Sequence, residues 1–239
     1  MKTNLQLKDS GDQITKDFGK KLMGTGQLKM KEVKVPAYTG IGSRETPEEI
    51  LKIMEDAGWR LARVGYTLRS GGAGGADAAF QRGMQRFHED CNMTQSPSRL
   101  AEIYVPWNNF KGGQGLKDLY NISLNEIDKD FPQHKEMRWD WVKEVHGGWD
   151  KLSQGARKLH ERNVHQIFGK NLSNAYLMQS KFVIYYAKET RTGNPKGGTA
   201  TAVNLAKKSG VRTLNLWKED NITVLENFLV NLESKRGLR

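Results

Sequence analysis

The chain has 239 residues, enough for one large domain with a sizeable core, and 38 Lys and Arg against 27 Asp and Glu give a formal net charge of +11. A single cysteine, Cys91, excludes an internal disulfide framework and argues against a zinc site. The chain has neither a run of 18 apolar residues nor a signal-peptide core, so we expect a cytoplasmic protein that does not span a membrane.

The positive charge is concentrated in one segment. Residues 151–212 hold 12 Lys and Arg against 2 Asp and Glu, whereas residues 1–150 hold 22 against 21. Such a concentration suits a polyanionic or phosphate-bearing partner, although a solvated basic face without a ligand would have the same composition.

Residues 1–32 are polar and lack a sustained hydrophobic period, which predicts a loose N-terminal arm with one short helix near Ile14–Met23. We expect residues 33–239 to form a single domain. Its first strand, in VKVPAYTGIGS, leads into TPEEILKIMEDAGWRLARVG, a helical pattern with Thr46 as N-cap, Pro47 as first helical residue and Glu49 as capping partner.

Strands and helices then alternate along the chain. The patterns predict strands at 66–70, 101–105, 181–187 and 212–216, and helices at 76–87, 156–168, 199–209 and 222–232. This alternation predicts an α/β fold with a Rossmann-like open, mainly parallel sheet and helices on both faces.

An insertion at about 107–154 interrupts the alternation and shows no regular pattern. It carries four of the six tryptophans, at positions 107, 139, 141 and 149. These rings could stack nucleic-acid bases, form a lid over a small ligand, or form the insertion's own small core.

Three glycine-bearing turns follow predicted strands: GIGSRET, SGGAGGAD and NPKGGTATA. Open parallel sheets bind ligands beyond the carboxyl ends of their strands, where backbone N–H groups at helix N-termini attract anions. The three turns therefore outline one anion pocket, although strand-helix packing alone could also require the glycines.

The turns differ in chemistry. The third is the best phosphate cradle, because Lys196, Gly197 and Gly198 precede Thr199 and no acid follows in the first helical turn. In the first turn the helix start is acidic, so ligand contact falls to Ser43 and Arg44. Asp77 could accept a ribose hydroxyl, hold a neighbouring loop, or serve only the helix dipole.

Several common site classes do not fit. GIGSRE lacks the G-x-G-x-x-G spacing of an NAD site, SGGAGGAD lacks the Lys-Ser/Thr ending of a P-loop, and no H-E-x-x-H, G-x-S-x-G or paired-cysteine motif occurs. The five histidines are dispersed. We therefore expect neither a metal site nor a cofactor.

Three segments in order resemble the core of DNA-processing protein A (DprA) and its wider relatives, the SLOG superfamily, which includes LOG-type nucleotide phosphoribohydrolases. They are YTGIGSRETP, LRSGGAGGAD and the stretch from LHERNVHQIFGK to GNPKGGTATA and SGVRTLNL, and the similarity covers about residues 35–106 and 155–217. In that family the corresponding residues border one anion pocket. The resemblance thus implies the site Gly42, Ser43, Arg44, Gly71, Gly72, Gly75, Asp77, Arg162, Asn163, Gly197, Gly198 and Thr199, to which the chemistry of the third turn adds Lys196.

The resemblance implies a protein that binds single-stranded DNA in DNA processing or recombination, with a RecA-type recombinase as a partner and a homodimer as the assembly. The hydrolase branch closes its motif as P-G-G-x-G-T-x-x-E, where the glutamate assists N-glycosidic cleavage. Here the turn is one residue shorter and Ala202 replaces that glutamate, so an N-glycosidase would have to use Glu161 or Asp77. A sensor or sponge for a small nucleotide signal is a third alternative. The compact chain also resembles a phage version of the family.

Overall fold

The computed structural model describes residues 35–93, 100–110 and 121–238. The expected N-terminal arm at 1–32 and its short helix near Ile14–Met23 lie outside the described residues.

Six strands form one sheet in the order β4-β3-β2-β1-β5-β6, and every neighbouring pair is parallel. In chain order they are β1 (Ala37–Gly42), β2 (Thr67–Ser70), β3 (Ala101–Val105), β4 (Asn121–Ser123), β5 (Phe182–Tyr186) and β6 (Arg212–Asn215). The chain moves outward from β1 to β4 and then returns to the other side of β1. The order of the strands therefore reverses between β1 and β5.

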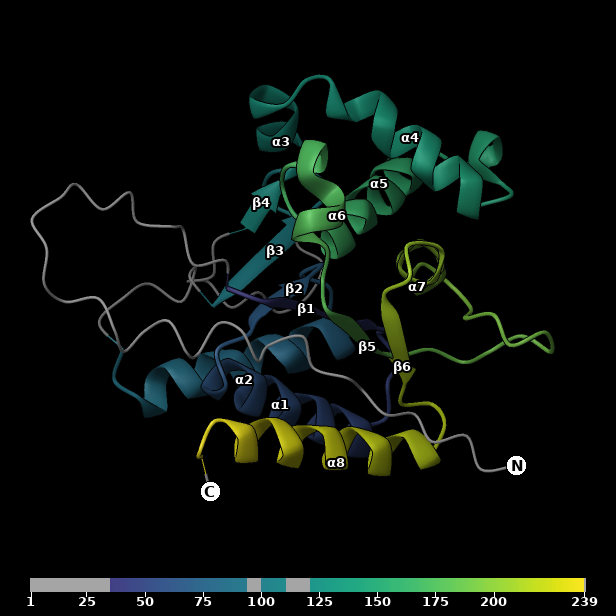
Figure 1. The fold of residues 1–239 in the computed structure, drawn as a ribbon. Helices are drawn as coiled ribbons and strands as arrows, with labels where there is room; N and C mark the ends of the chain where they lie inside the picture. The colour runs from purple at the N-terminus through teal and green to yellow at the C-terminus, as the bar shows by residue number, and fades with distance from the viewer. Residues whose placement is uncertain (1–34, 94–99, 111–120, 239) are drawn as a thin grey trace, which may run out of the picture. The chain divides into compact units, whose positions relative to one another are not determined.

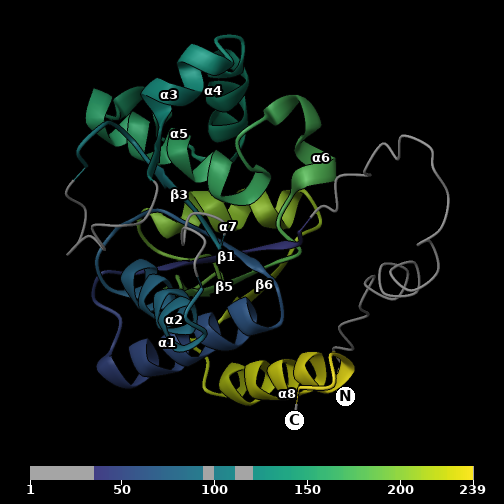
Figure 2. The ribbon, with the colours of Figure 1, turned by 90° about the vertical axis from the view of Figure 1, so that its left-hand side faces the viewer.

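Helices cover both faces of the sheet (Figures 1 and 2). One face carries α1 (Glu48–Arg63), α2 (Ala76–Asp90) and α8 (Asp220–Lys235). The other face carries α3 (Leu124–Asp130), α4 (His134–Val145), α5 (Gln154–Phe168), α6 (Ala175–Met178) and α7 (Thr199–Lys208), with short 3-10 turns η2 (Trp149–Lys151) and η3 (Leu172–Asn174). The predicted Rossmann-like α/β fold with a parallel sheet is confirmed.

The position of β5 between β1 and β6 explains why its sequence is apolar throughout. Phe182, Ile184 and Tyr186 enter the core beneath α1, α2 and α8, whereas Val183 and Tyr185 enter the core beneath α5 and α7. All five residues are buried, as expected for a parallel strand covered on both faces. None of the described helices has the length and apolar composition needed to cross a membrane.

Two expectations about local structure are wrong. The segment from Trp107 to Gln154 is not irregular where it is described, because it adds β4 to the sheet and forms α3 and α4. A capping box at Ser123 and Glu126 starts α3 and was visible in the sequence as S-x-x-E. Thr46 is not the N-cap of α1, because its hydroxyl instead donates to the carbonyl of Ser43 at 2.8 Å and the helix begins after Pro47.

The tryptophans of the insertion mainly extend the core beneath α5 and α7. Trp149 is buried, and Trp139 and Trp141 are half-buried against the same cluster of apolar residues from α5 and α7. Trp107 contacts Phe110 edge to face. This arrangement agrees with a packing role, in which the insertion braces α5 from outside.

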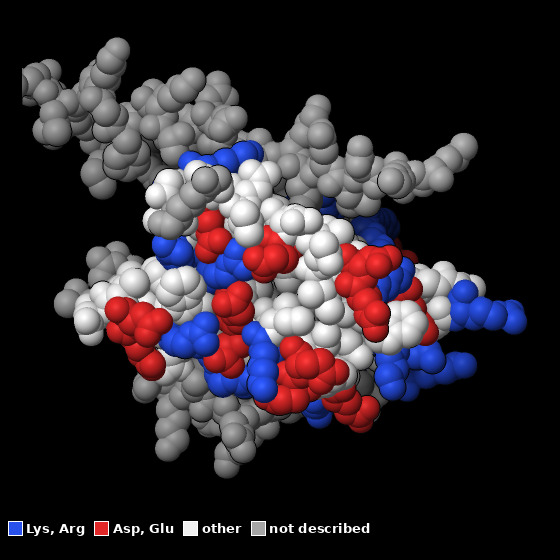
Figure 3. All heavy atoms as spheres, turned by 90° about the horizontal axis from the view of Figure 1, so that it is seen from below, with Lys and Arg blue, Asp and Glu red and all other residues white. Residues whose placement is uncertain are grey.

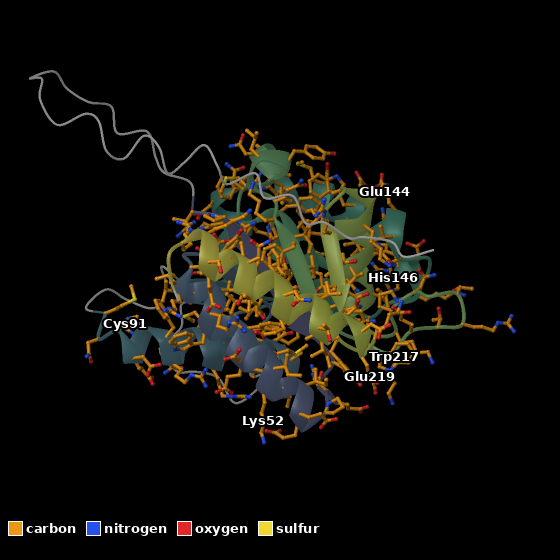
Figure 4. The ribbon with its side chains drawn as sticks, turned by 60° about the horizontal axis from the view of Figure 1, so that its bottom comes forward. Lys52, Cys91, Glu144, His146, Trp217 and Glu219 are labelled. Carbon is orange, nitrogen blue, oxygen red and sulfur yellow. The ribbon has the colours of Figure 1, made fainter. Side chains whose placement is uncertain are left out.

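Helix α2 runs from the carboxyl edge of the sheet toward the opposite edge. It starts at the carboxyl edge with Ala76 and ends after Asp90 at the exposed Cys91. Figure 4 shows Cys91 on the far side of the molecule from Trp217 and His146.

Candidate anion-binding site

The three glycine-bearing turns leave adjacent strands in the sheet. They follow β2, β1 and β5, which are neighbours in that order, and Gly42 at the end of β1 is level with Tyr186 at the end of β5. The sheet topology therefore brings the turns together at the point where the strand order reverses, a usual place for ligand sites in open α/β sheets.

The loop after β1 is fixed between the other two turns. The Ser43 N–H donates to the Tyr186 carbonyl at 2.9 Å, and the Ala76 N–H donates to the Ser43 carbonyl at 3.2 Å. Gly75 has a φ of +71°, and a Cβ there would lie 2.5 Å from the Ser43 oxygen. Glycine is thus required at this position both by the left-handed backbone and by the close approach of the β1 loop.

Asp77 holds two of these turns. Its carboxylate is 2% exposed and accepts backbone N–H bonds from Gly42 (3.1 Å), Gly71 (3.2 Å) and Ala73 (3.3 Å). Burial raises the pKa of this carboxyl above its usual range, while Arg162 and the three amides act in the opposite direction. Of the three roles considered from the sequence, the contacts agree with holding a neighbouring loop.

Arg162 reaches the site from α5. Its guanidinium lies against Gly71, where a Cβ would overlap it, and its Nη1 is 3.8 Å from the Asp77 carboxylate. Burial lowers the pKa of Arg162, Asp77 raises it, and the nearby charge of Arg44 lowers it. The Arg162 Nε has no hydrogen-bond partner among the described residues. An Arg side chain that reaches the site can bind an anion there through its other N–H groups.

The N-terminus of α7 forms the opposite wall. The Asn163 side chain donates to the Gly198 carbonyl at 2.9 Å, which ties α5 to the turn before α7. Gly198, the N-cap residue, has no side chain to occupy the first N–H groups, and Thr199–Ala202 bring no carboxylate. The positive end of the helix dipole therefore faces the site without an internal counter-charge.

These elements enclose a cavity of about 460 Å³. Three cationic side chains, those of Arg44, Arg162 and Lys196, line it. Its remaining wall is partly apolar, with Ile41, Ala156 and Leu159. The lining therefore combines cationic and apolar side chains, with two carboxylates among them.

Most of the residues expected at the site line this cavity, namely Gly42, Ser43, Arg44, Asp77, Arg162, Asn163, Lys196, Gly197, Gly198 and Thr199. The other three, Gly71, Gly72 and Gly75, do not line it. Gly71 and Gly75 lie behind it, where their missing side chains make room for Arg162 and for the β1 loop.

Sequence reasoning missed three lining residues with polar side chains, His160, Gln166 and Glu45. His160 and Gln166 each lie three residues from Asn163 on α5, so the helical period was the signal that could have found them. The His160 Nδ1 is 2.7 Å from the Thr201 hydroxyl, and its ring is 4.4 Å from that of His146. Burial, with His146 and Arg162 adding to it, lowers the pKa of His160 to about 4.

The carboxylates proposed for catalysis are engaged elsewhere. Glu161 turns away from the cavity, and its Oε2 lies 3.4 Å from the buried Arg138 guanidinium. Asp77 is held by three amides, and Ala202 is fully buried. Glu45 is the exposed carboxylate among the described lining residues.

The described residues contain no group of three or more His, Cys, Asp or Glu side chains placed to hold a metal ion.

The face formed by α1, α2 and α8 is different in charge from the cavity. Figure 3 shows Lys and Arg intermixed with Asp and Glu across this face. Ion pairs account for part of the pattern, including Arg60 with Glu226 (2.7 Å) and Arg82 with Glu55 (2.9 Å). Cations there are locally neutralised, as Arg162 of the cavity is by Asp77, whereas Arg44 and Lys196 form no ion pair with a described residue.

Comparison with known proteins gives one match. No family model matches the sequence, and no curated protein matches it. Among solved structures, the fold is similar to that of DNA processing protein A from Helicobacter pylori, described for its single-stranded DNA binding mode. The TM-score is 0.49 and the sequence identity 15%, covering 84% of this chain and 82% of that chain.

Proposed function

We propose that the cavity binds phosphate groups of single-stranded nucleic acid, as in DprA-like proteins, without catalysing a reaction. The observation that carries this proposal is the convergence of Arg44, Arg162 and Lys196 on the open N-terminus of α7 within one cavity. Backbone N–H groups and guanidinium groups are the donors that phosphate prefers, and they act without reference to base sequence.

The cavity lining offers contacts for both the phosphate and the rest of a nucleotide. A phosphate would lie against the cationic side chains, and the apolar side chains of Ala156 and Leu159 would contact sugar or base. The cavity volume of about 460 Å³ is within the usual range for small-ligand sites and suits about one nucleotide. Further nucleotides of a strand would have to lie outside the cavity.

Binding is favoured over N-glycosidase chemistry because the carboxylates of Glu161 and Asp77 already contact other groups of the protein. Cleavage of an N-glycosidic bond needs an acid or base placed at the sugar, and the two named substitutes are held by other groups. Release of free base from nucleoside monophosphates, measured by chromatography, tests this directly. Turnover would overturn the non-catalytic part of the proposal.

The test of binding is a titration of labelled oligothymidine and of a labelled mononucleotide, followed by fluorescence anisotropy at several salt concentrations. Arg44→Ala and Lys196→Ala change exposed side chains and should each weaken binding about 3- to 10-fold, because each removes one charged contact. Arg162→Gln should weaken it more, with folding checked by circular dichroism.

Lys52→Ala is the matched control, because Lys52 is an exposed cation on α1, on the other side of the sheet (Figure 4). Equal losses for Lys52→Ala and Arg44→Ala would count against the assigned cavity. Tight binding of the mononucleotide with no gain for longer oligomers would instead favour a nucleotide sensor or sponge.

A role in DNA processing or recombination, a RecA-type recombinase partner and a homodimer are finer parts of the proposal. They rest on the resemblance of the three sequence segments alone. Recombinase loading onto coated single strands and size-exclusion chromatography with light scattering test them separately from binding.

A further inference from the structure

The segment between β5 and α7 forms a projecting arm, residues 188–196, which we call the basic arm (Figure 1). Its two sides pair through the Lys196 N–H to the Lys188 carbonyl (2.8 Å) and the Thr190 N–H to the Asn194 carbonyl (2.8 Å). The Gly193 N–H closes the tip by donating to the Thr190 carbonyl at 3.0 Å. The arm is thus an ordered hairpin whose last residue, Lys196, already lines the cavity.

The arm carries a net positive charge on its surface. Lys188, Arg191 and Lys196 are exposed. Its one acid, Glu189, is mostly buried and accepts from Asn215 Nδ2 at 3.0 Å and from Lys218 Nζ at 3.1 Å. Burial alone would raise the pKa of Glu189, but these contacts with Asn215 and Lys218 outweigh it and lower the pKa. The carboxylate is therefore used inside the protein and does not neutralise the arm's outer cations.

An exposed tryptophan lies at the base of this arm. Trp217 follows β6 and is 42% exposed, an unusual position for so large an apolar side chain. The buried Asn215 connects the two features, because its Oδ1 accepts from the Trp217 N–H (3.2 Å) while its Nδ2 donates to Glu189 of the arm. Trp217 is therefore held next to the base of the basic arm.

The order of the strands places these features in a row. The loop after β1 lines the cavity, the arm follows β5, Trp217 follows β6, and these strands are neighbours in that order. From this geometry we propose that a single-stranded nucleic acid leaves the cavity, passes along the basic arm and stacks a base on Trp217. This inference rests on the proposed function of the cavity and adds a second, base-stacking contact to it.

The chemistry of the row fits a polynucleotide in particular. Exposed cations spaced along a hairpin can pair with successive phosphates, and an exposed aromatic ring accepts any base. Beyond Trp217 the chain turns acidic at Glu219 and Asp220, where α8 starts. Figure 4 shows Glu219 next to Trp217, so these carboxylates would repel phosphates and limit the track to the cavity side of the ring.

The experiment compares the affinities of a mononucleotide, oligothymidines of increasing length and an oligomer of abasic sites for the full chain. Trp217→Ala should weaken oligothymidine binding about 5- to 150-fold, the loss expected for one stacked base, and leave mononucleotide binding unchanged. The abasic oligomer should bind the parent and Trp217→Ala proteins equally well. Arg191→Ala should lower the dependence of log affinity on log salt by about 0.7 for oligomers alone.

Tyr176→Ala is the matched control, because Tyr176 is an aromatic residue that is 77% exposed on α6. Helix α6 precedes β5 in the chain, whereas the basic arm follows β5. Loss of mononucleotide binding in Arg44→Ala with no effect of Trp217→Ala on oligothymidine would overturn the track and leave the cavity proposal standing. Equal weakening of thymidine and abasic oligomers by Trp217→Ala would also overturn it, as would equal competition by a polyglutamate peptide.

Discussion

Gly71 and Gly198 differ in whether packing requires a glycine. At Gly71 a Cβ would overlap the guanidinium of Arg162, so packing demands glycine there. At Gly198 the backbone has φ −62° and ψ −25°, and a Cβ would meet no described atom within 4 Å. The fold therefore leaves room for a side chain at Gly198, and a methyl group there would obstruct only the proposed binding of an anion at the start of α7.

Gly198→Ala should accordingly separate stability from binding. We expect the free energy of unfolding to change by at most about 1 kcal/mol, because Gly198 has helical backbone angles that Ala adopts without strain. Affinity for oligothymidine should fall about tenfold, because the methyl group keeps phosphate from the N–H groups. Urea unfolding and anisotropy measure the two quantities. Gly147→Ala, at another glycine with open space around it, is the control, and equal affinity of the two variants would contradict the role of Gly198.

Site residues were predictable from the sequence where a side chain suited to binding an anion lies in a turn that follows a predicted strand. Ser43, Arg44 and Lys196 lie in turns that any parallel sheet would bring to its carboxyl edge. His160 and Gln166 could be reached only through the helical period of α5, which places each of them three residues from Asn163.

Among the helices, α5 is held from both sides. Its residues from Glu161 to Phe168 are all buried, between the sheet and the insertion. Arg138 on α4 is fully buried and joins the insertion to α5, with Nη2 at 2.5 Å from Asp128 and 3.4 Å from Glu161. The residue next to Glu161 is Arg162, so this buried contact fixes the part of α5 that carries the site.

Arg138→Met should destabilise the protein by about 3 to 5 kcal/mol, because it leaves the carboxylate of Glu161 buried without its cation. Glu161→Gln in the same chain should recover part of the loss by removing that charge. Urea denaturation of the single and double variants measures both effects. Unchanged stability of Arg138→Met would show that this pair does not hold the insertion against α5.

Long elements with a clear period, such as α1 and α2, were predictable from the sequence. The short elements of the insertion were not, because β4 has three residues and α3 has seven, too few for periodicity to register. Their stability comes from pairing with β3 and from packing, which are tertiary effects.

For the whole molecule, buried histidines make stability depend on pH. Burial, opposed by the hydrogen bond to Gly169, lowers the pKa of His165 to about 3, and the pKa of His160 is lowered to about 4. The unfolded chain binds protons at these residues near pH 6.5, whereas the folded protein resists them. Stability should therefore fall as the pH decreases below about 6.5.

His165→Asn should flatten this dependence, since its amide can donate to the Gly169 carbonyl that His165 Nδ1 now contacts at 2.9 Å. Between pH 7 and pH 5 the parent chain should lose about 2 kcal/mol more than the variant through this one residue. Urea unfolding at the two pH values measures the difference. Parallel pH profiles for the two proteins would show that His165 takes up protons equally in the folded and unfolded states.

The fold class followed from the alternation of strands and helices, but the order of the strands did not. Which strand lies beside β1 is decided by packing of the complete chain, and the reversal between β1 and β5 creates the cavity. Convergence of the three turns could thus be expected from the rule for open sheets, whereas the row of cavity, arm and Trp217 required the structure.

The position of Cys91 makes it a suitable attachment site for single-molecule experiments. The thiol is the only one in the chain, is exposed, and lies at the end of α2 opposite the end that carries Asp77. A 15-residue helix is about 22 Å long, so a maleimide dye or a surface tether there would leave the carboxyl edge of the sheet unobstructed.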